Sequence, residues 1–148
     1  MSEGVALDHV SAVSAELTDA IHRLAPQLSD GPPPDEETIG RVLEAGGRIV
    51  VARLDGAIVG VGTVIIAAAL SGTTAHVEDV VVDEAARGRG IGELLVRELI
   101  GIAHAEGADE VALTSHPRRE AANRLYPRLG FELGGTNYYT LELEDEHG

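Results

Sequence analysis

The sequence predicts one α+β domain, built on a mixed, mostly antiparallel sheet that is flanked by helices. Three features predict this class: two helical patterns early in the chain, a run of strands joined by tight turns, and a later strand–helix–strand order. The chain has 148 residues, which is ordinary for a single domain with a sizeable buried core. Residues 1–148 are therefore expected to form one domain.

The first part of the chain carries the patterns of one short strand and two helices. Hydrophobic residues alternate over 5–9, which indicates an edge strand. Ser14 is a suitable N-cap for a helix that Pro26 ends, and the hydrophobic face of that helix consists of Leu17, Ala20, Ile21, Leu24 and Leu28. After a proline-rich loop, Asp35 caps a short helix that stops at two glycines.

The middle of the chain predicts an antiparallel meander. Two apolar runs, 48–53 and 57–70, flank Asp55-Gly56, and Asp-Gly is a strong signal for a two-residue hairpin turn. A second turn at Ser71-Gly72 leads into a third strand over 73–82. These three strands are expected to form the body of the sheet.

The last part of the chain alternates between helix and strand. The patterns predict a helix over about 90–105, a strand over 109–114 and a helix over 120–129. The segments 131–133 and 137–143 have the alternation of a closing hairpin. Because a helix connects them, strand 109–114 and the third meander strand are expected to form a strand–helix–strand crossover.

Composition and charge narrow the class of protein. The formal net charge is −14, all eleven basic residues are arginine, and cysteine is absent. The missing cysteine excludes disulfides, thiolate zinc sites and a cysteine nucleophile. A field of this sign repels nucleic acid and anionic membranes and favours cationic small molecules or basic peptides, although negative charge also serves simple solubility.

Neither a metal site nor a membrane segment is expected. No set of His, Asp and Glu residues has metal-ligand spacing, and the longest apolar stretch is too short to span a bilayer. The chain opens without a pattern of an export signal, so the expected location is the cytoplasm.

The segment 87–92, Arg-Gly-Arg-Gly-Ile-Gly, lies between an apolar strand and an amphipathic helix. The first N–H groups of a helix lack internal partners and carry the positive end of its dipole, so they bind anions. The glycines in this segment let an anion approach the backbone, and Arg87 and Arg89 add positive charge. A chain without lysine cannot form a Walker A loop, and Glu93 stands where the dinucleotide fingerprint needs its last glycine.

The spacing Arg-x-x-Gly-x-Gly at Arg87, Gly90 and Gly92 resembles the pyrophosphate-binding loop of the GNAT acetyltransferase superfamily, which binds acetyl-CoA. The segment 122–131, ANRLYPRLGF, resembles a later motif of the same superfamily, and the order of elements agrees over nearly the whole chain. The resemblance implies the GNAT (acyl-CoA N-acyltransferase) fold, acetyl-CoA as cosubstrate and N-acetyl transfer as the reaction.

The resemblance also implies which residues contact acetyl-CoA. Main-chain groups at the end of the third meander strand pair with the pantetheine arm, provided that strand 109–114 splays away there, and the glycine-rich loop holds the pyrophosphate. The superfamily often has an asparagine at the position of Arg119, and that asparagine contacts the pantetheine arm. Asn123 is expected to take over part of this contact. The other implied residues are Val80, Val81, Val82, Arg87, Gly88, Arg89, Gly90, Ile91, Gly92 and Glu93.

Two side chains are the main candidates for catalysis. Direct transfer of an acetyl group from a thioester to an amine requires that the amine lose a proton and the leaving thiolate gain one. Tyr126 matches the superfamily's tyrosine beside the coenzyme sulfur, and a phenol with a pKa of about 10 can protonate a thiolate. Glu78 stands nine residues before Arg87, as a glutamate does in the diamine acetyltransferases that the chain resembles. Glu78 is therefore the expected base, acting through a water, and His76 on the same strand face is the competing base.

The predicted function is acetyl transfer from acetyl-CoA to a primary amine by direct attack, with Tyr126 as general acid and Glu78 as general base. Two alternatives stay open: a non-catalytic module that binds or senses acetyl-CoA, and an acetyltransferase of protein lysines or N-termini. The charge favours a cationic acceptor, either a small molecule or a peptide, and a homodimer is compatible with the sequence. Four acidic residues between the early helices are candidates for attracting it: Asp30, Asp35, Glu36 and Glu37.

Overall fold

The structure, a computed structural model, describes residues 4–144. The chain divides into two units, one that ends at His116 and one that begins at Pro117. The first unit holds a sheet with three α-helices, and the second holds one α-helix and an extended segment. No helix within 4–144 combines the length and the apolar character that crossing a membrane requires.

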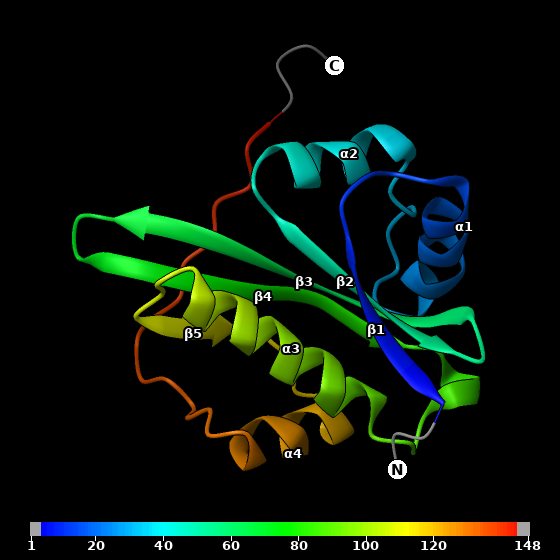
Figure 1. Cartoon of the computed structure of the whole chain (residues 1–148). Coiled ribbons are helices and arrows are strands. Elements are labelled where there is room, and N and C mark those ends of the chain that lie inside the picture. The colour runs from blue at the N-terminus through cyan, green and yellow to red at the C-terminus, as the bar shows by residue number, and fades with distance from the viewer. Residues whose placement is uncertain (1–3, 145–148) are drawn as a thin grey trace. The chain divides into compact units, whose positions relative to one another are not determined.

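Five strands of the first unit form one sheet, in the order β1-β2-β3-β4-β5 (Figure 1). Neighbouring strands are antiparallel except for the last pair, in which β5 is parallel to β4. The strands are β1 (Val5–Val10), β2 (Arg48–Leu54), β3 (Ala57–Ala69), β4 (Gly72–Val82) and β5 (Glu110–Leu113). The predicted meander and the parallel crossover are therefore confirmed, as is the α+β class.

The tight turn between β2 and β3 forms where the Asp-Gly pair predicts it. Asp55 and Gly56 both have positive φ, 52° and 87°, as a two-residue hairpin turn of the primed type requires. Beside this turn, Arg53 joins three elements: its guanidinium lies 2.6 Å from a carboxylate oxygen of Asp8 on β1 and 2.8 Å from Glu16 on the first helix. This ion-pair network fixes the edge strand to the helix layer.

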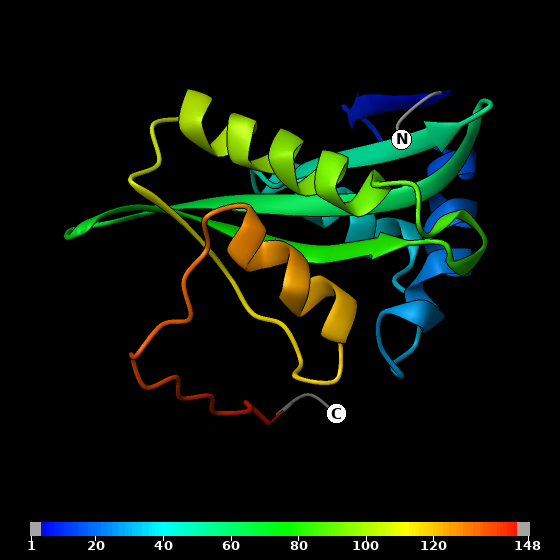
Figure 2. The same ribbon diagram turned by 90° about the horizontal axis from the view of Figure 1, so that it is seen from below.

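Helices cover both faces of the sheet (Figure 2). Helices α1 (Ala15–Leu24) and α2 (Glu36–Glu44) lie on one face, and α3 (Ile91–Ala105) lies on the other. The predicted caps are present, since the Ser14 side chain accepts a hydrogen bond from the Leu17 N–H and Asp35 accepts one from the Thr38 N–H. A single 3₁₀ turn, η1 (Ala25–Gln27), contains Pro26 and ends the first helix as expected.

Side chains alternate between the two faces of the sheet along each strand, and this decides which of them pack against which helices. The face under α1 and α2 has a core in which Leu17, Leu24 and Ile39 pack against strand residues that include Val61 and Val81. On the opposite face α3 lies very close to the sheet, because a Cβ atom at Gly62 would come within 2.9 Å of Leu99. The glycines of β3 thus set the distance at which α3 packs.

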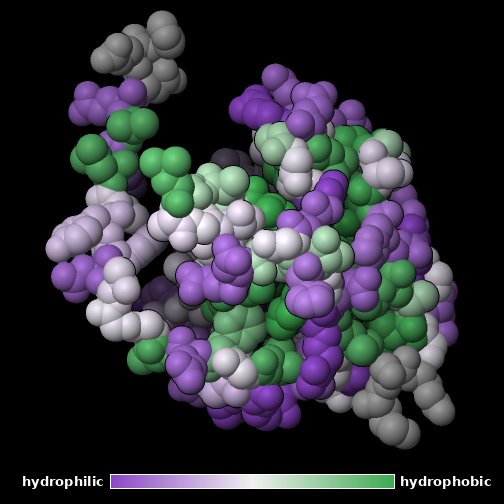
Figure 3. Space-filling view, turned by 60° about the vertical axis from the view of Figure 1, so that its left-hand side comes forward, coloured by the Kyte–Doolittle hydropathy of each residue, from purple (hydrophilic) through white to green (hydrophobic). Residues whose placement is uncertain are grey.

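The second unit contains α4 (Glu120–Arg128) and an extended segment that follows it. The predicted closing hairpin is wrong: within the described residues 129–144 no strand forms, and five of its large apolar side chains are exposed, namely Leu133, Tyr138, Tyr139, Leu141 and Leu143. Figure 3 shows hydrophobic and hydrophilic residues mixed along it. The alternation is present in the sequence, but an isolated two-stranded hairpin is marginal in water without a third strand or a packed face.

Candidate active site

The end of β4 extends beyond the strand that pairs with it. The parallel pairing of β4 with β5 runs from Thr74 to Val77, where Val77 faces Leu113, and β4 continues to Val82. The segment 78–82 therefore has no ladder with β5 along that edge. The predicted strand 109–114 is thus shorter in the structure, and β5 ends where β4 continues.

A β-bulge interrupts β4 at the middle of this segment. Asp79 has φ 55°, and the pairing with β3 shifts from Thr63 opposite Glu78 to Val61 opposite Val81. Because of the extra residue, Glu78 and Val81 share one face of the sheet although they are three positions apart. Strict alternation, which the sequence suggests, would place them on opposite faces.

Two acidic groups meet at the bulge, and each has a raised pKa. Burial raises the pKa of the Glu78 carboxyl, the nearby Asp79 charge raises it further, and His76 lowers it. Burial also raises the pKa of Asp79, against a hydrogen bond with Thr63 that lowers it. A carboxylate with a raised pKa is a stronger base, so Glu78 is suited to accept a proton.

The coenzyme loop, which we define as residues 83–90, joins β4 to α3. It begins with a 3₁₀ turn, η2 (Glu84–Ala86), which the Asp83 side chain caps by accepting a hydrogen bond from the Ala85 N–H at 3.2 Å. It ends at Gly90, the N-cap of α3, whose φ of 76° lies in the left-handed region. Gly88 has a similar φ of 83°. The sequence prediction of a strand, a glycine-rich loop and a helix N-terminus is confirmed, and this backbone suits a diphosphate.

The remaining residues implied as coenzyme contacts lie around this loop. The Arg87 side chain donates from Nε to the Val82 carbonyl at 3.2 Å, whereas Arg89 is exposed. The Ile91 side chain is buried, so a contact from this residue to the coenzyme would come from its main chain. Glu93, in the first turn of α3, pairs with Arg97 at 3.2 Å. The strand end, Glu78 and the loop therefore belong to one continuous stretch of the first unit.

Tyr126 and Asn123 lie on α4, in the second unit. The Tyr126 ring is buried and meets Phe131 edge-on, with ring centroids 5.8 Å apart. Burial raises the pKa of the Tyr126 phenol and Arg119 lowers it, so the phenol is protonated at neutral pH. Asn123 donates from Nδ2 to the Pro117 carbonyl at 3.5 Å, across the start of its own helix. The structure thus brings the candidate residues of the first unit together. Tyr126 and Asn123 belong to the second unit and lie on one helix there.

The acidic residues between α1 and α2 have a structural explanation. Asp35 is the N-cap of α2, and a backbone hydrogen bond from Thr38 lowers its pKa. Glu36 and Glu37 occupy the first turn, where the helix dipole favours negative charge, and Glu37 pairs with Arg41 at 3.5 Å. Three of the four acids therefore have a structural role at the start of α2. Among residues 4–144 no group of three His, Asp or Glu side chains is placed to hold a metal ion.

Comparison with known proteins identifies the family. Residues 15–131 match the model of the acetyltransferase (GNAT) family. The chain is a GNAT acetyltransferase. It is 34% identical over 128 residues to glucosamine 6-phosphate N-acetyltransferase 1 of Oryza sativa subsp. japonica, an alignment that covers 79% of this chain and 76% of that protein. GNAT acetyltransferases are acyltransferases that use acetyl-CoA as cosubstrate.

Solved structures agree with this GNAT fold. A Trypanosoma brucei acetyltransferase superposes with a TM-score of 0.74 at 26% identity and covers 94% of this chain and 99% of its own. An aminoglycoside acetyltransferase from an uncultured soil metagenomic sample has a TM-score of 0.80 at 20% identity, with 95% and 99% covered. The second comparison concerns the fold alone.

Sequence reasoning missed one feature of the site in this GNAT acetyltransferase. The buried Thr63 donates from Oγ1 to the Glu78 carbonyl at 2.9 Å and contacts Asp79, so it supports the bulge from β3. The sequence does hold a signal for the bulge, because two adjacent acids followed by three valines break the two-residue alternation of a strand.

Proposed function

We propose that this acetyltransferase moves the acetyl group of acetyl-CoA to a primary amine of a small molecule by direct attack. One observation carries the proposal: β4 runs past β5 and passes, through the coenzyme loop, into the N-terminus of α3. An open strand edge followed by an anion site suits a long thioester whose pantetheine arm leads to a diphosphate. The other implied contacts, from Val80 to Glu93 and at Asn123, belong to the same proposal.

The reaction forms the C–N bond and breaks the C–S bond. Glu78 accepts the proton that the attacking amine loses, through a water, and its raised pKa supports this role. Main-chain N–H groups at the end of β4 stabilise the charge that develops on the carbonyl oxygen. Tyr126 donates its proton to the departing thiolate and regains one from solvent, and its raised pKa keeps the phenol protonated beforehand.

An amino sugar is the first acceptor to test. The Oryza sativa relative is named for glucosamine 6-phosphate, a phosphorylated amino sugar. The net charge of −14 favours a cationic amine over a phosphorylated one, so unphosphorylated glucosamine and polyamines belong in the same panel. A basic peptide in the panel covers acetylation of protein side chains.

Tyr126→Phe separates a catalyst from a module that only binds acetyl-CoA. The variant keeps the ring and its contact with Phe131 but loses the hydroxyl, so the fold and the affinity for acetyl-CoA should change little. Because general acid catalysis typically contributes 10²–10⁴-fold, kcat should fall by about that factor. Release of free thiol with the amine panel measures this.

The same assay decides between the functions. If the wild-type chain binds acetyl-CoA but releases no thiol with any amine, it is a binding module. If Tyr126→Phe keeps the wild-type kcat, water protonates the thiolate and Tyr126 is structural.

A further inference from the structure

Gln27 connects the end of the first helix layer to the coenzyme loop. It is the last residue of η1 and is half-buried. Its Oε1 atom accepts a hydrogen bond from the Glu84 N–H at 2.9 Å and lies 3.5 Å from Nη2 of Arg87. One side chain therefore contacts the loop at two points, and these points enclose the 3₁₀ turn.

Arg87 is held against the protein by all three of its guanidinium nitrogens. Nη2 faces Gln27, Nε donates to the Val82 carbonyl at 3.2 Å, and Nη1 lies 3.9 Å from the Glu84 carboxylate. In this position the arginine ties the end of β4 to the turn that follows it. Gln27 adds the contact from outside the loop.

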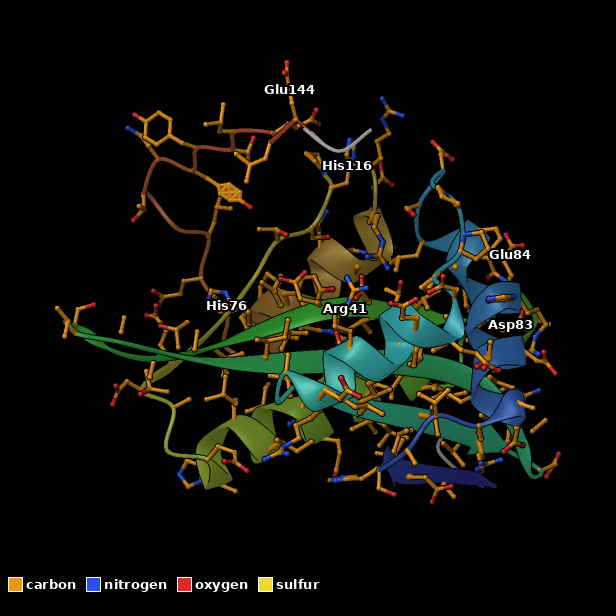
Figure 4. All side chains as sticks on the ribbon, turned by 90° about the horizontal axis from the view of Figure 1, so that it is seen from above. Arg41, His76, Asp83, Glu84, His116 and Glu144 are labelled. Atoms are coloured by element: carbon orange, nitrogen blue, oxygen red, sulfur yellow. The ribbon has the colours of Figure 1, made fainter. Side chains whose placement is uncertain are left out.

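A residue of α1, Arg23, supports the same region. Arg23 donates to the Ile58 carbonyl on β3 and forms an ion pair with Asp83, 3.7 Å away. Asp83 is the residue that caps η2. Figure 4 shows Asp83 and Glu84 beside the first helix. The α1–η1 segment thus holds the start of the coenzyme loop through Arg23 and through Gln27.

We propose that Gln27 is a positioning residue that fixes the coenzyme loop in the conformation that binds acetyl-CoA. This inference rests on the proposed function, because it takes the loop as the diphosphate site. The glycines that give the loop its geometry also make it flexible, and ordering it on binding costs conformational entropy. A contact that orders the loop beforehand strengthens binding by removing that cost, although Gln27 itself lies outside the glycine-rich motif.

The test compares four proteins: wild type, Gln27→Leu, Gln27→Glu and Asp19→Ala. Leucine keeps the approximate size but accepts no hydrogen bond, whereas glutamate keeps an acceptor for both donors. Asp19 is an exposed carboxylate on α1 and serves as the matched control. The measurements are the Kd of acetyl-CoA by calorimetry, KM and kcat with an amine acceptor, and amide hydrogen exchange over 83–90.

Gln27→Leu should weaken acetyl-CoA binding about 5- to 10-fold, the effect of one or two lost hydrogen bonds, and should speed exchange at Glu84. KM for acetyl-CoA should rise while kcat at saturation stays near the wild-type value. Gln27→Glu should restore slow exchange at Glu84, because its carboxylate accepts the same hydrogen bonds, and Asp19→Ala should match wild type. A structural effect alone would lower the unfolding temperature without this split between KM and kcat.

The inference is overturned if Gln27→Leu binds acetyl-CoA as tightly as wild type, or if exchange at Glu84 is as fast in Gln27→Glu as in Gln27→Leu. Failure of the proposed function has a different signature. In that case the wild-type chain itself would either fail to bind acetyl-CoA or bind it and release no thiol with any amine.

Discussion

Glu78 and Asp79 show how much one inserted residue changes at the scale of single side chains. The bulge moves Asp79 out of the ladder and leaves Glu78 facing the same side as Val81, the side covered by α1 and α2. Each carboxyl is partly desolvated, and their proximity raises the pKa of Glu78 further. The proposed base is therefore one of two acids that the sequence merely places in succession.

The pH dependence of the reaction tests this base. If Glu78 is the base, it acts when it is deprotonated, so kcat/KM should rise with pH through its pKa, at a pH above the usual carboxylate range. Glu78→Gln should lower kcat/KM by about 10²-fold. His76→Gln removes a group that lowers the pKa of Glu78, so the acidic limb should move to higher pH while most activity remains. Initial rates across pH on the three proteins measure both effects.

The reverse result identifies the other base. If His76→Gln loses the activity and Glu78→Gln retains it, then His76 takes the proton and Glu78 acts only through its charge beside His76.

At the scale of elements, the packing of α3 positions the helix N-terminus that we propose as the anion site. Leu95 and Leu99 of this helix are fully buried, and the glycine at position 62 of β3 lets the helix lie close to the sheet. This packing fixes the helix axis, and Gly90 at the N-cap then turns the chain in the left-handed conformation. The direction of the helix dipole relative to β4 is thereby built into the core.

Gly90→Val tests the anion site. Valine is branched at Cβ and disfavours a φ of 76°, so the loop must change its course. We expect acetyl-CoA binding to weaken by roughly 2 kcal/mol or more, about 30-fold in Kd, measured by calorimetry.

Gly101→Ala is the matched control on the same helix. Gly101 is exposed within α3, and a Cβ there would meet no atom within 4 Å. This variant should gain roughly 0.5–1 kcal/mol of stability and bind acetyl-CoA unchanged. Equal binding by Gly90→Val and wild type would remove the loop from the coenzyme site.

At the scale of the whole molecule, the net charge of −14 creates a negative field around a site that must bind a negative coenzyme. The helix N-terminus and the loop offer positive potential only locally. A cationic amine, in contrast, is attracted over the longer range. The negative charge of the molecule therefore repels the coenzyme and attracts a cationic acceptor.

Salt dependence tests whether the charge selects the acceptor. For a cationic amine, kcat/KM should fall as salt rises, because screening shortens the range of the field to about 10 Å at 0.1 M. A neutral analogue of the same acceptor should show little change. Initial rates at several salt concentrations measure this. An equal salt dependence for both amines would mean that the net charge serves solubility only.

The sequence by itself determined the features that depend on neighbours along the chain. The caps at Ser14 and Asp35 and the turn at Asp55-Gly56 follow from short-range hydrogen bonds and backbone sterics. Periodicity fixed the order of helices and strands up to α4 for the same reason. The glycine-rich loop was identifiable because its spacing is itself a local pattern.

The tertiary structure alone decided where distant segments meet. The early end of the β4–β5 pairing, the support of the bulge by Thr63 and the contact of Gln27 with Glu84 join residues far apart in the chain. The alternating segment 137–143 gave the same local signal as a strand, yet it stays outside any ladder in the structure. A strand forms only when a partner supplies its hydrogen bonds, and that partner is not encoded in the pattern of the strand itself.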